Sequence, residues 1–172
     1  SFPFFLLLFF SLFSPFLPSL KTLEYRGYDS WGVAIGVNGH IEVQKQPGKI
    51  ANATVDFTPS EIGFGHTRWA THGGVTRENA HPNLDGEGRI AVIHNGIIEN
   101  FVELRQKLEE KGHIFSSDTD TESVAHLLED EYRECNNDLA EAMRRVCRQL
   151  RGAFTLVAIH TGSPDRVVGA RR

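Results

Sequence analysis

Short apolar segments, separated by polar and glycine-containing stretches, predict most of the strands of this chain. The first is residues 33–37, and Asn38-Gly39 follows it as the favoured two-residue hairpin turn. Residues 40–45 then place Ile41 and Val43 between polar neighbours, which is the alternation of a return strand. Further strands are predicted at residues 63–69, 90–93, 152–159 and 166–168.

Three amphipathic helices are predicted between the strands at 90–93 and 152–159. Each begins with a pair typical of a helix start: Asn100 with Glu103, Thr119 with Glu122, and Asp138 with Glu141. Gly112 ends the first of them. Their inward faces carry apolar residues: Leu104 and Leu108; Val124, Leu127 and Leu128; Ala142, Val146 and Leu150. Strands and helices in separate blocks, with no repeat or linker, indicate one α+β domain with helices layered on antiparallel sheets.

Four polar runs stand out against this background. Two directly follow predicted strands, His66–Gly73 (HTRWATHG) and His94–Asn100 (HNGIIEN). The others are Leu23–Ser30 (LEYRGYDS) and Ser117–Glu122 (SDTDTE). Polar groups at strand ends usually bind or react with a small molecule, because loops on a rigid scaffold carry function. For any single run, the alternative is an ordinary polar loop.

The four runs, in this order and spacing, resemble the glutaminase domain of the glutamine–fructose-6-phosphate aminotransferases (isomerizing). The match begins near Leu23 and continues to the C-terminus. It implies an N-terminal-nucleophile-type four-layer αββα sandwich, here incomplete, with residues 21–172 as a partial class II (type 2) glutamine amidotransferase domain. It also implies the family's chemistry, in which an N-terminal cysteine attacks the side-chain amide of glutamine and releases ammonia.

The resemblance assigns substrate contacts to residues of these runs. It implies that Arg68 binds the glutamine carboxylate, as a bidentate guanidinium can, and that Asp120 accepts from the ammonium group. Asn95 and the backbone N–H of Gly96 would form the oxyanion hole. The alternatives are a surface salt bridge for Arg68, charge matching at a helix N-terminus for Asp120, and a plain turn for Asn95-Gly96.

Other matched residues would flank or support this pocket. The resemblance places Trp69, Thr71 and His72 beside it, although Trp69 suits a core position equally well. The run Arg26, Gly27, Tyr28 and Asp29 would support the site without reacting.

Composition and charge exclude several other functions. With 172 residues and a formal net charge of −4, the chain has no basic block that would suit a nucleic acid. Cys135 and Cys147 have no metal-ligand or disulfide spacing, so we expect packing cysteines and a reducing, cytoplasmic location. The scattered histidines, among them His66, His72, His81 and His94, lack metal-binding spacing. We therefore expect no metal and no cofactor.

Residues 1–20 differ from the rest of the chain. They comprise only seven Phe, six Leu, four Ser and three Pro. A signal peptide would need a positive start and a small-residue cleavage site, and prolines interrupt the run as a membrane helix. All four amino acids have codons that can begin with two pyrimidines. We therefore expect a translated non-coding tract that is not part of the native protein. A targeting or membrane segment and a core element are the alternatives.

The family's nucleophilic cysteine should head the chain, where this run lies instead. Cys135 and Cys147 are far from the start, and Ser1 is a weak substitute. We expect the 172-residue chain to bind glutamine poorly and to hydrolyse none. The resemblance implies glutamine as partner, fructose 6-phosphate bound by sugar-isomerase domains beyond Arg172, a homo-oligomeric full-length enzyme, and no membrane or nucleic acid. Two alternatives are an amidophosphoribosyltransferase-like domain with another acceptor and a catalytically dead, glutamine-binding or membrane-tethered module.

Overall fold

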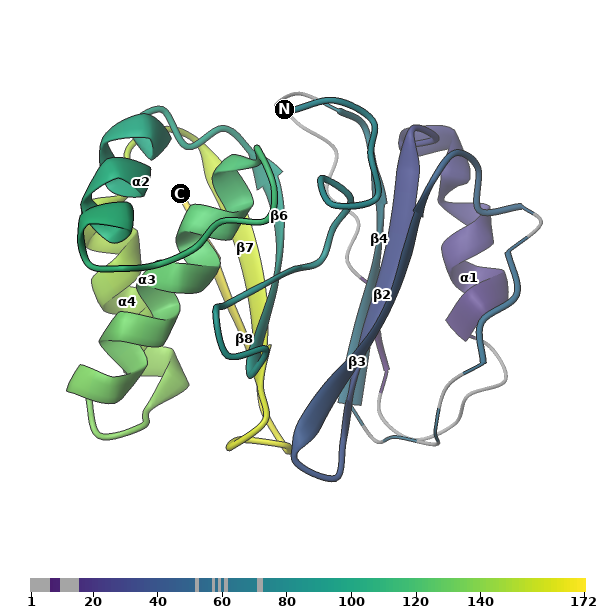
Figure 1. The fold of residues 1–172 in the computed structure, drawn as a ribbon. Helices are drawn as coiled ribbons and strands as arrows, with labels where there is room; N and C mark the ends of the chain where they lie inside the picture. Colours follow the sequence, from purple (N-terminus) through teal and green to yellow (C-terminus); the bar gives the residue numbers. More distant parts are fainter. Residues whose placement is uncertain are drawn as a thin grey trace.

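The chain forms four layers, with two antiparallel sheets enclosed between helices (Figure 1). This computed structural model describes residues 7–9, 16–51, 53–56, 58, 60, 62–70 and 73–172. Helix α1 covers the outer face of one sheet, and α2, α3 and α4 cover the outer face of the other (Figure 1). The predicted α+β sandwich is confirmed.

The first sheet has four strands in the order β1-β4-β2-β3. Its strands are β1 (Leu7–Phe9), β2 (Ser30–Val37), β3 (His40–Pro47) and β4 (Ile62–Arg68). The hairpin between β2 and β3 is the predicted one, because Asn38 and Gly39 have the positive φ angles, 46° and 83°, that this turn requires. The 3-10 turn η1 (Glu24–Arg26) precedes β2.

The second sheet has the order β5-β6-β7-β8. Its strands are β5 (Asn83–Leu84), β6 (Ile90–Gly96), β7 (Phe154–His160) and β8 (Val167–Arg171). Strand β5 was not predicted because two residues show no periodicity. Strand β6 extends three residues beyond its predicted end and includes Asn95 and Gly96.

The helices are α1 (Phe16–Thr22), α2 (Phe101–Glu110), α3 (Asp120–Glu134) and α4 (Leu139–Gln149). The starts of α2, α3 and α4 are confirmed, because Asn100, Thr119 and Asp138 stand at their N-cap positions. Among these three residues only Asp138 caps with its side chain, whose carboxylate accepts from the N–H groups of Ala140 and Glu141 at 2.9 and 3.1 Å. The Asn100 amide instead joins α2 to the end of α4, through Gln149 O and Arg151 N.

Strands buried on both faces create three apolar layers. On β6, Ile90 and Val92 face α2–α4, while Ala91 and Ile93 face the first sheet. On β2, Val33 faces α1 with Val37 and Ile35, and Ala34 faces the second sheet. A fully buried side chain of this size contributes about 1.5–3 kcal/mol, so the layers hold the two sheets in register.

Parts of residues 1–20 take part in these layers. Strand β1 pairs with β4, and Leu20 of α1 is only 1% exposed, packing in the cluster that includes Trp31. An apolar run of any origin would cover an apolar sheet face, so the prediction that residues 1–20 are not native stays a prediction. Within the described residues, no helix combines the length and the apolar character of a membrane span.

Candidate functional site

Arg68 is the last residue of β4, and its side chain points into the protein. Arg68 is 4% exposed, so the surface salt bridge is excluded as its role. Burial lowers the pKa of its guanidinium, and the carboxylates of Asp120 and Asp29 raise it. Asp29 is itself fixed beside the strand end, because its carboxylate accepts from Ala70 N at 2.9 Å and its own N–H donates to Arg68 O at 3.2 Å.

Asp120 is the first residue of α3 and is 5% exposed. Its Oδ2 accepts from the backbone N–H of Ile98 at 2.9 Å, and its Oδ1 lies 3.5 Å from His94 Nδ1. These contacts attach the start of α3 to the end of β6. The carboxylate therefore stands at a helix N-terminus, and its negative charge also acts on the guanidinium of Arg68.

Asn95 and Gly96 are the last two residues of β6, so a plain turn is wrong for them. His66 Nε2 lies 3.2 Å from Asn95 Oδ1. With the amide oxygen held by the imidazole N–H, the amide NH₂ of Asn95 is left as a donor, which is what an oxyanion requires. Gly96 has φ 123°, and a Cβ there would strike the carbonyl of Ala153, so only glycine fits.

A central histidine cluster, formed by His66, His81 and His94, connects these residues. The ring centroids of His66 and His81 are 4.8 Å apart, and those of His81 and His94 are 6.5 Å apart. Thr121 Oγ1 contacts both His81 Nε2, at 3.0 Å, and His94 Nδ1, at 3.2 Å. Burial lowers the pKa of His66 to about 4 and that of His81 well below its usual value, and the positive Arg68 acts in the same direction. Both rings are therefore neutral at pH 7.

Trp69 is outside the core, with 57% of its surface exposed. Its ring packs edge-on against Tyr28, with centroids 5.1 Å apart, at the mouth of the same end of the sandwich. Gly27 lies so close that a Cβ there would be 2.7 Å from Thr67 O, which explains a glycine between two larger residues. Thr71 and His72 lie outside the described residues.

The run SDTDTE acts mainly as a support for Asp120. The Glu122 carboxylate accepts from the backbone N–H groups of Ser116 and Ser117 at 2.7 and 2.6 Å, which folds the segment before α3. Asn83 Nδ2 donates to Ser117 Oγ at 2.9 Å and to Thr119 Oγ1 at 2.6 Å. Asp120 is thus the member of this run that faces Arg68.

Sequence reasoning missed the segment 79–83 that completes this support. Asn79 Oδ1 accepts from Asp118 N at 2.9 Å, and Lys45 of β3 donates to the carbonyls of Glu78, Ala80 and Pro82 at 3.0, 2.8 and 3.0 Å. The signal was available as the polar run Asn79-Ala80-His81-Pro82-Asn83, which follows the HTRWATHG run.

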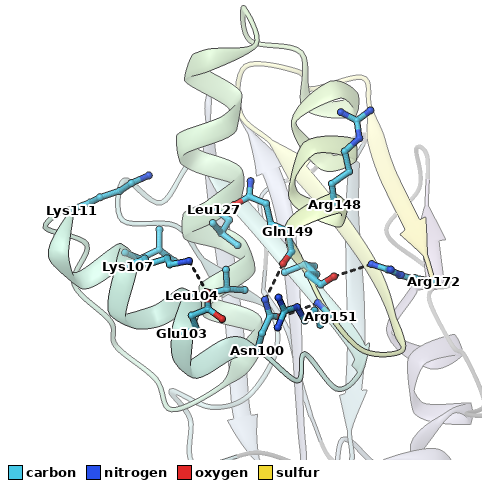
Figure 2. A pocket seen from close by; sticks show the side chains of 12 residues that line it. Asn100, Glu103, Leu104, Lys107, Lys111, Leu127, Arg148, Gln149, Arg151 and Arg172 are labelled. Carbon is cyan, nitrogen blue, oxygen red and sulfur yellow. Dashed lines mark hydrogen bonds and ion pairs between the residues drawn. The ribbon is translucent and has the colours of Figure 1, made fainter.

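A cavity of about 500 Å³ lies elsewhere, on the outer side of α2 and the end of α4 (Figure 2). Five of its twelve lining residues are cationic: Lys107, Lys111, Arg148, Arg151 and Arg172. Figure 2 shows Asn100 bridging to Gln149 and Arg151 at its floor. None of the predicted site residues that the structure describes lines this cavity.

Comparison with known proteins identifies the family. The family model described as "Glutamine amidotransferase domain" matches residues 66–171, which include Arg68, Asn95, Gly96 and Asp120. The chain belongs to this glutamine amidotransferase family. The family expected from the four runs is thereby confirmed.

Curated relatives carry one name. Glutamine–fructose-6-phosphate aminotransferase [isomerizing] of Streptomyces coelicolor is 58% identical over 161 residues, covering 91% of this chain. The proteins of the same name from Corynebacterium glutamicum and Methanothermobacter thermautotrophicus are 54% and 48% identical. The amidotransferase chain spans only 26% of the length of the Streptomyces relative.

Solved structures agree with this assignment. The glutamine phosphoribosylpyrophosphate amidotransferase of B. subtilis has a TM-score of 0.73 and 26% identity, covering 90% of this chain and 33% of that one. A second structure, described as the allosteric regulatory enzyme of purine biosynthesis, has a TM-score of 0.71 and 28% identity over 84% of this chain and 32% of that one. Because the identity to the aminotransferases is about twice as high, the amidophosphoribosyltransferase-like alternative is less supported.

Proposed function

We propose that this domain binds glutamine at the joined ends of β4 and β6 and supplies its amide nitrogen for the synthesis of glucosamine 6-phosphate. One observation supports this site above all. Arg68 and Asp120 are both about 95% buried, and the charge of the Asp120 carboxylate acts on the Arg68 guanidinium. A free amino acid presents the complementary carboxylate and ammonium at its α-carbon.

The roles of the individual residues follow from their chemistry. Arg68 binds the α-carboxylate of glutamine, and Asp120 accepts from its ammonium group. The Asn95 NH₂, oriented by His66, donates with Gly96 N–H to the oxygen of the substrate amide, whose charge grows as a nucleophile attacks. Trp69 contacts the substrate from the exposed side. Thr71 and His72 complete the pocket.

The acceptor is fructose 6-phosphate, and the complete protein is a homo-oligomer in the cytoplasm. The acceptor rests on the shared name of the aminotransferase relatives, which are 48–58% identical to this chain. The location is supported by Cys135 and Cys147, both free thiols, as a reducing compartment would keep them.

Glutamine binding tests the site directly. L-glutamine is titrated against the chain by calorimetry, with Arg68→Lys as the variant and the exposed pair member Arg89→Lys as the matched control. Lysine keeps the charge but loses the bidentate geometry, so we expect binding to weaken at least roughly tenfold in Arg68→Lys and to stay unchanged in the control. Equal affinities for both variants would refute the site.

The acceptor is tested separately with the protein from the complete coding sequence. We expect it to form glucosamine 6-phosphate from glutamine and fructose 6-phosphate, and to release no phosphoribosylamine from phosphoribosyl pyrophosphate. The reverse result would leave the glutamine site intact but would assign the domain to the other class of amidotransferase.

A further inference from the structure

We propose that His113, His126 and Glu129 form a binding site for a divalent metal ion of the zinc class. This trio, here named the helix histidine cluster, is separate from the central histidine cluster. His126 and Glu129 lie one turn apart on α3, and His113 follows the end of α2. The expectation of no metal rested on the spacing of histidines along the sequence. No such spacing connects His113 to this face of α3.

The distances within the cluster match the coordination of a small metal ion. His113 Nδ1 and His126 Nδ1 are 3.1 Å apart, and Glu129 Oε2 lies 3.7 and 3.6 Å from them. Ligands at 2.0–2.1 Å from a tetrahedral zinc ion are separated by about 3.4 Å. The three atoms therefore define one face of such a tetrahedron. The fourth position is left for water, as in sites with three protein ligands.

Hydrogen-bond requirements direct the imidazole lone pairs toward this point. Asp130 Oδ1 lies 3.0 Å from His113 Nε2, so that nitrogen carries the proton and Nδ1 carries the lone pair. His126 Nε2 is fully buried without a hydrogen-bond partner, and Glu122 Oε1 lies 3.9 Å from it. The Glu122 carboxylate attracts a proton on His126 Nε2, whereas it would repel a lone pair on that nitrogen. His126 Nδ1 then also presents a lone pair to His113 and Glu129.

Neighbouring groups hold the ligands in this orientation. Glu129 Oε2 accepts from Gly86 N at 3.1 Å, and Glu129 Oε1 pairs with Arg133 at 2.6 Å. The Asp130–His113 contact is the carboxylate–histidine arrangement that orients metal-binding imidazoles.

The charge balance around the cluster favours a cation. Glu129 belongs to the cluster, and the carboxylates of Glu122 and Asp130 face its two imidazoles. Two cations lie at its edge: Lys111 on Asp130 and Arg133 on Glu129. A proton shared by the imidazoles of His113 and His126 would also supply a positive charge. The titration below distinguishes such a proton from a metal ion.

Metal binding would fix the segment between α2 and α3 against α3 and, through Glu129, against the turn before β6. The ligands join that segment to α3, and Gly86 connects Glu129 to the turn before β6. Ser116 and Ser117 of the same segment hold Glu122 and lead to Asp120, about 9 Å from His126 along the helix at 1.5 Å per residue. The site would therefore stiffen the support of Asp120.

Titration of the full, chelator-treated chain with Zn²⁺, and separately with Co²⁺, tests the proposal. We expect one tight site per chain, a higher Tm with zinc, and the intense visible bands that cobalt shows only in a four-coordinate site. His113→Gln and Glu129→Gln should each weaken binding more than roughly 100-fold, and the positioning variant Asp130→Asn roughly 10–100-fold. The exposed controls His40→Gln and Glu141→Gln should bind as the parent does.

Each variant is compared with itself, with and without zinc, so a lower starting Tm does not hide the result. Should a ligand variant fail to fold, the partly exposed Asp130 and the cobalt spectrum of the parent still decide. The proposal is overturned if the parent chain takes up no zinc at equimolar metal, as a simple proton-sharing histidine pair would behave. It is also overturned if the ligand variants bind as tightly as the controls.

Discussion

The central and the helix histidine clusters differ in the charges that surround them. The central cluster lies beside the cations Arg68 and Lys45, with Asp120 as the carboxylate close to His94. The helix cluster contains the carboxylate of Glu129, and those of Glu122 and Asp130 face its imidazoles. The same side chain is thus a hydrogen-bonding group beside cations and a candidate metal ligand among carboxylates, because a metal ion needs negative charge around it.

Neutralising one carboxylate beside each set of histidines, Asp120 or Glu129, should produce the largest effects. Each variant should lose one ligand and keep the other. Asp120→Asn keeps an acceptor for Ile98 N–H but loses the charge that meets the substrate ammonium, so glutamine binding should weaken by about 2–5 kcal/mol while zinc binding stays. Glu129→Gln should abolish zinc binding and leave glutamine binding unchanged. Calorimetric titration of both variants with both ligands measures this. Loss of both ligands in either variant would show that the clusters are not independent.

Acid should destabilise the fold through the central cluster. The pKa of His66 is about 4 in the folded chain and about 6.5 when unfolded, so the unfolded chain binds the proton more strongly between these values. The contribution of His66 to the free energy of unfolding is fully present above pH 6.5. It is lost as the pH drops toward 4, which lowers the free energy of unfolding by about 3 kcal/mol. Urea unfolding at several pH values should show the loss in the parent and in His40→Gln, and a flatter profile in His66→Gln.

Ser117→Ala tests whether the two clusters share a support. The Ser117 hydroxyl contacts Glu122, which faces His126, and Asn83, which holds the segment before Asp120. Removing it leaves buried polar partners unsatisfied, so we expect a loss of about 1–3 kcal/mol in unfolding free energy. Both glutamine and zinc binding should weaken a few-fold. An effect on one ligand alone would mean that the segment supports only one cluster.

Asp138→Ala should have the smallest effect and serves as a reference outside both clusters. It removes the side-chain cap of α4, which costs about 1 kcal/mol of stability. Glutamine and zinc affinities should be those of the parent. A change in either affinity would indicate that general destabilisation, and not local chemistry, explains the other variants.

Local patterns predicted the elements well where local physics controls them. The alternation in β3, the Asn38-Gly39 turn and the Asp138 cap depend on neighbours in the sequence, and each was confirmed. Asn100 and Thr119 stand at the predicted helix starts, but their side chains do not cap those helices because they bond distant segments: Asn100 the end of α4, and Thr119 the side chain of Asn83. Such partners are separated by dozens of residues and leave no periodic signal.

The sequence by itself determined the layered α+β fold, the glutamine amidotransferase family and the polar runs that carry Arg68, Asn95, Gly96 and Asp120. Periodic burial and motif chemistry are properties of the chain, so they can be read along it. Only the tertiary structure decided which side chains are buried together, since burial and neighbouring charge set the protonation of each histidine. The electrostatic interaction of Arg68 with Asp120, the neutral rings of His66 and His81 and the meeting of His113 with His126 and Glu129 all come from packing between segments.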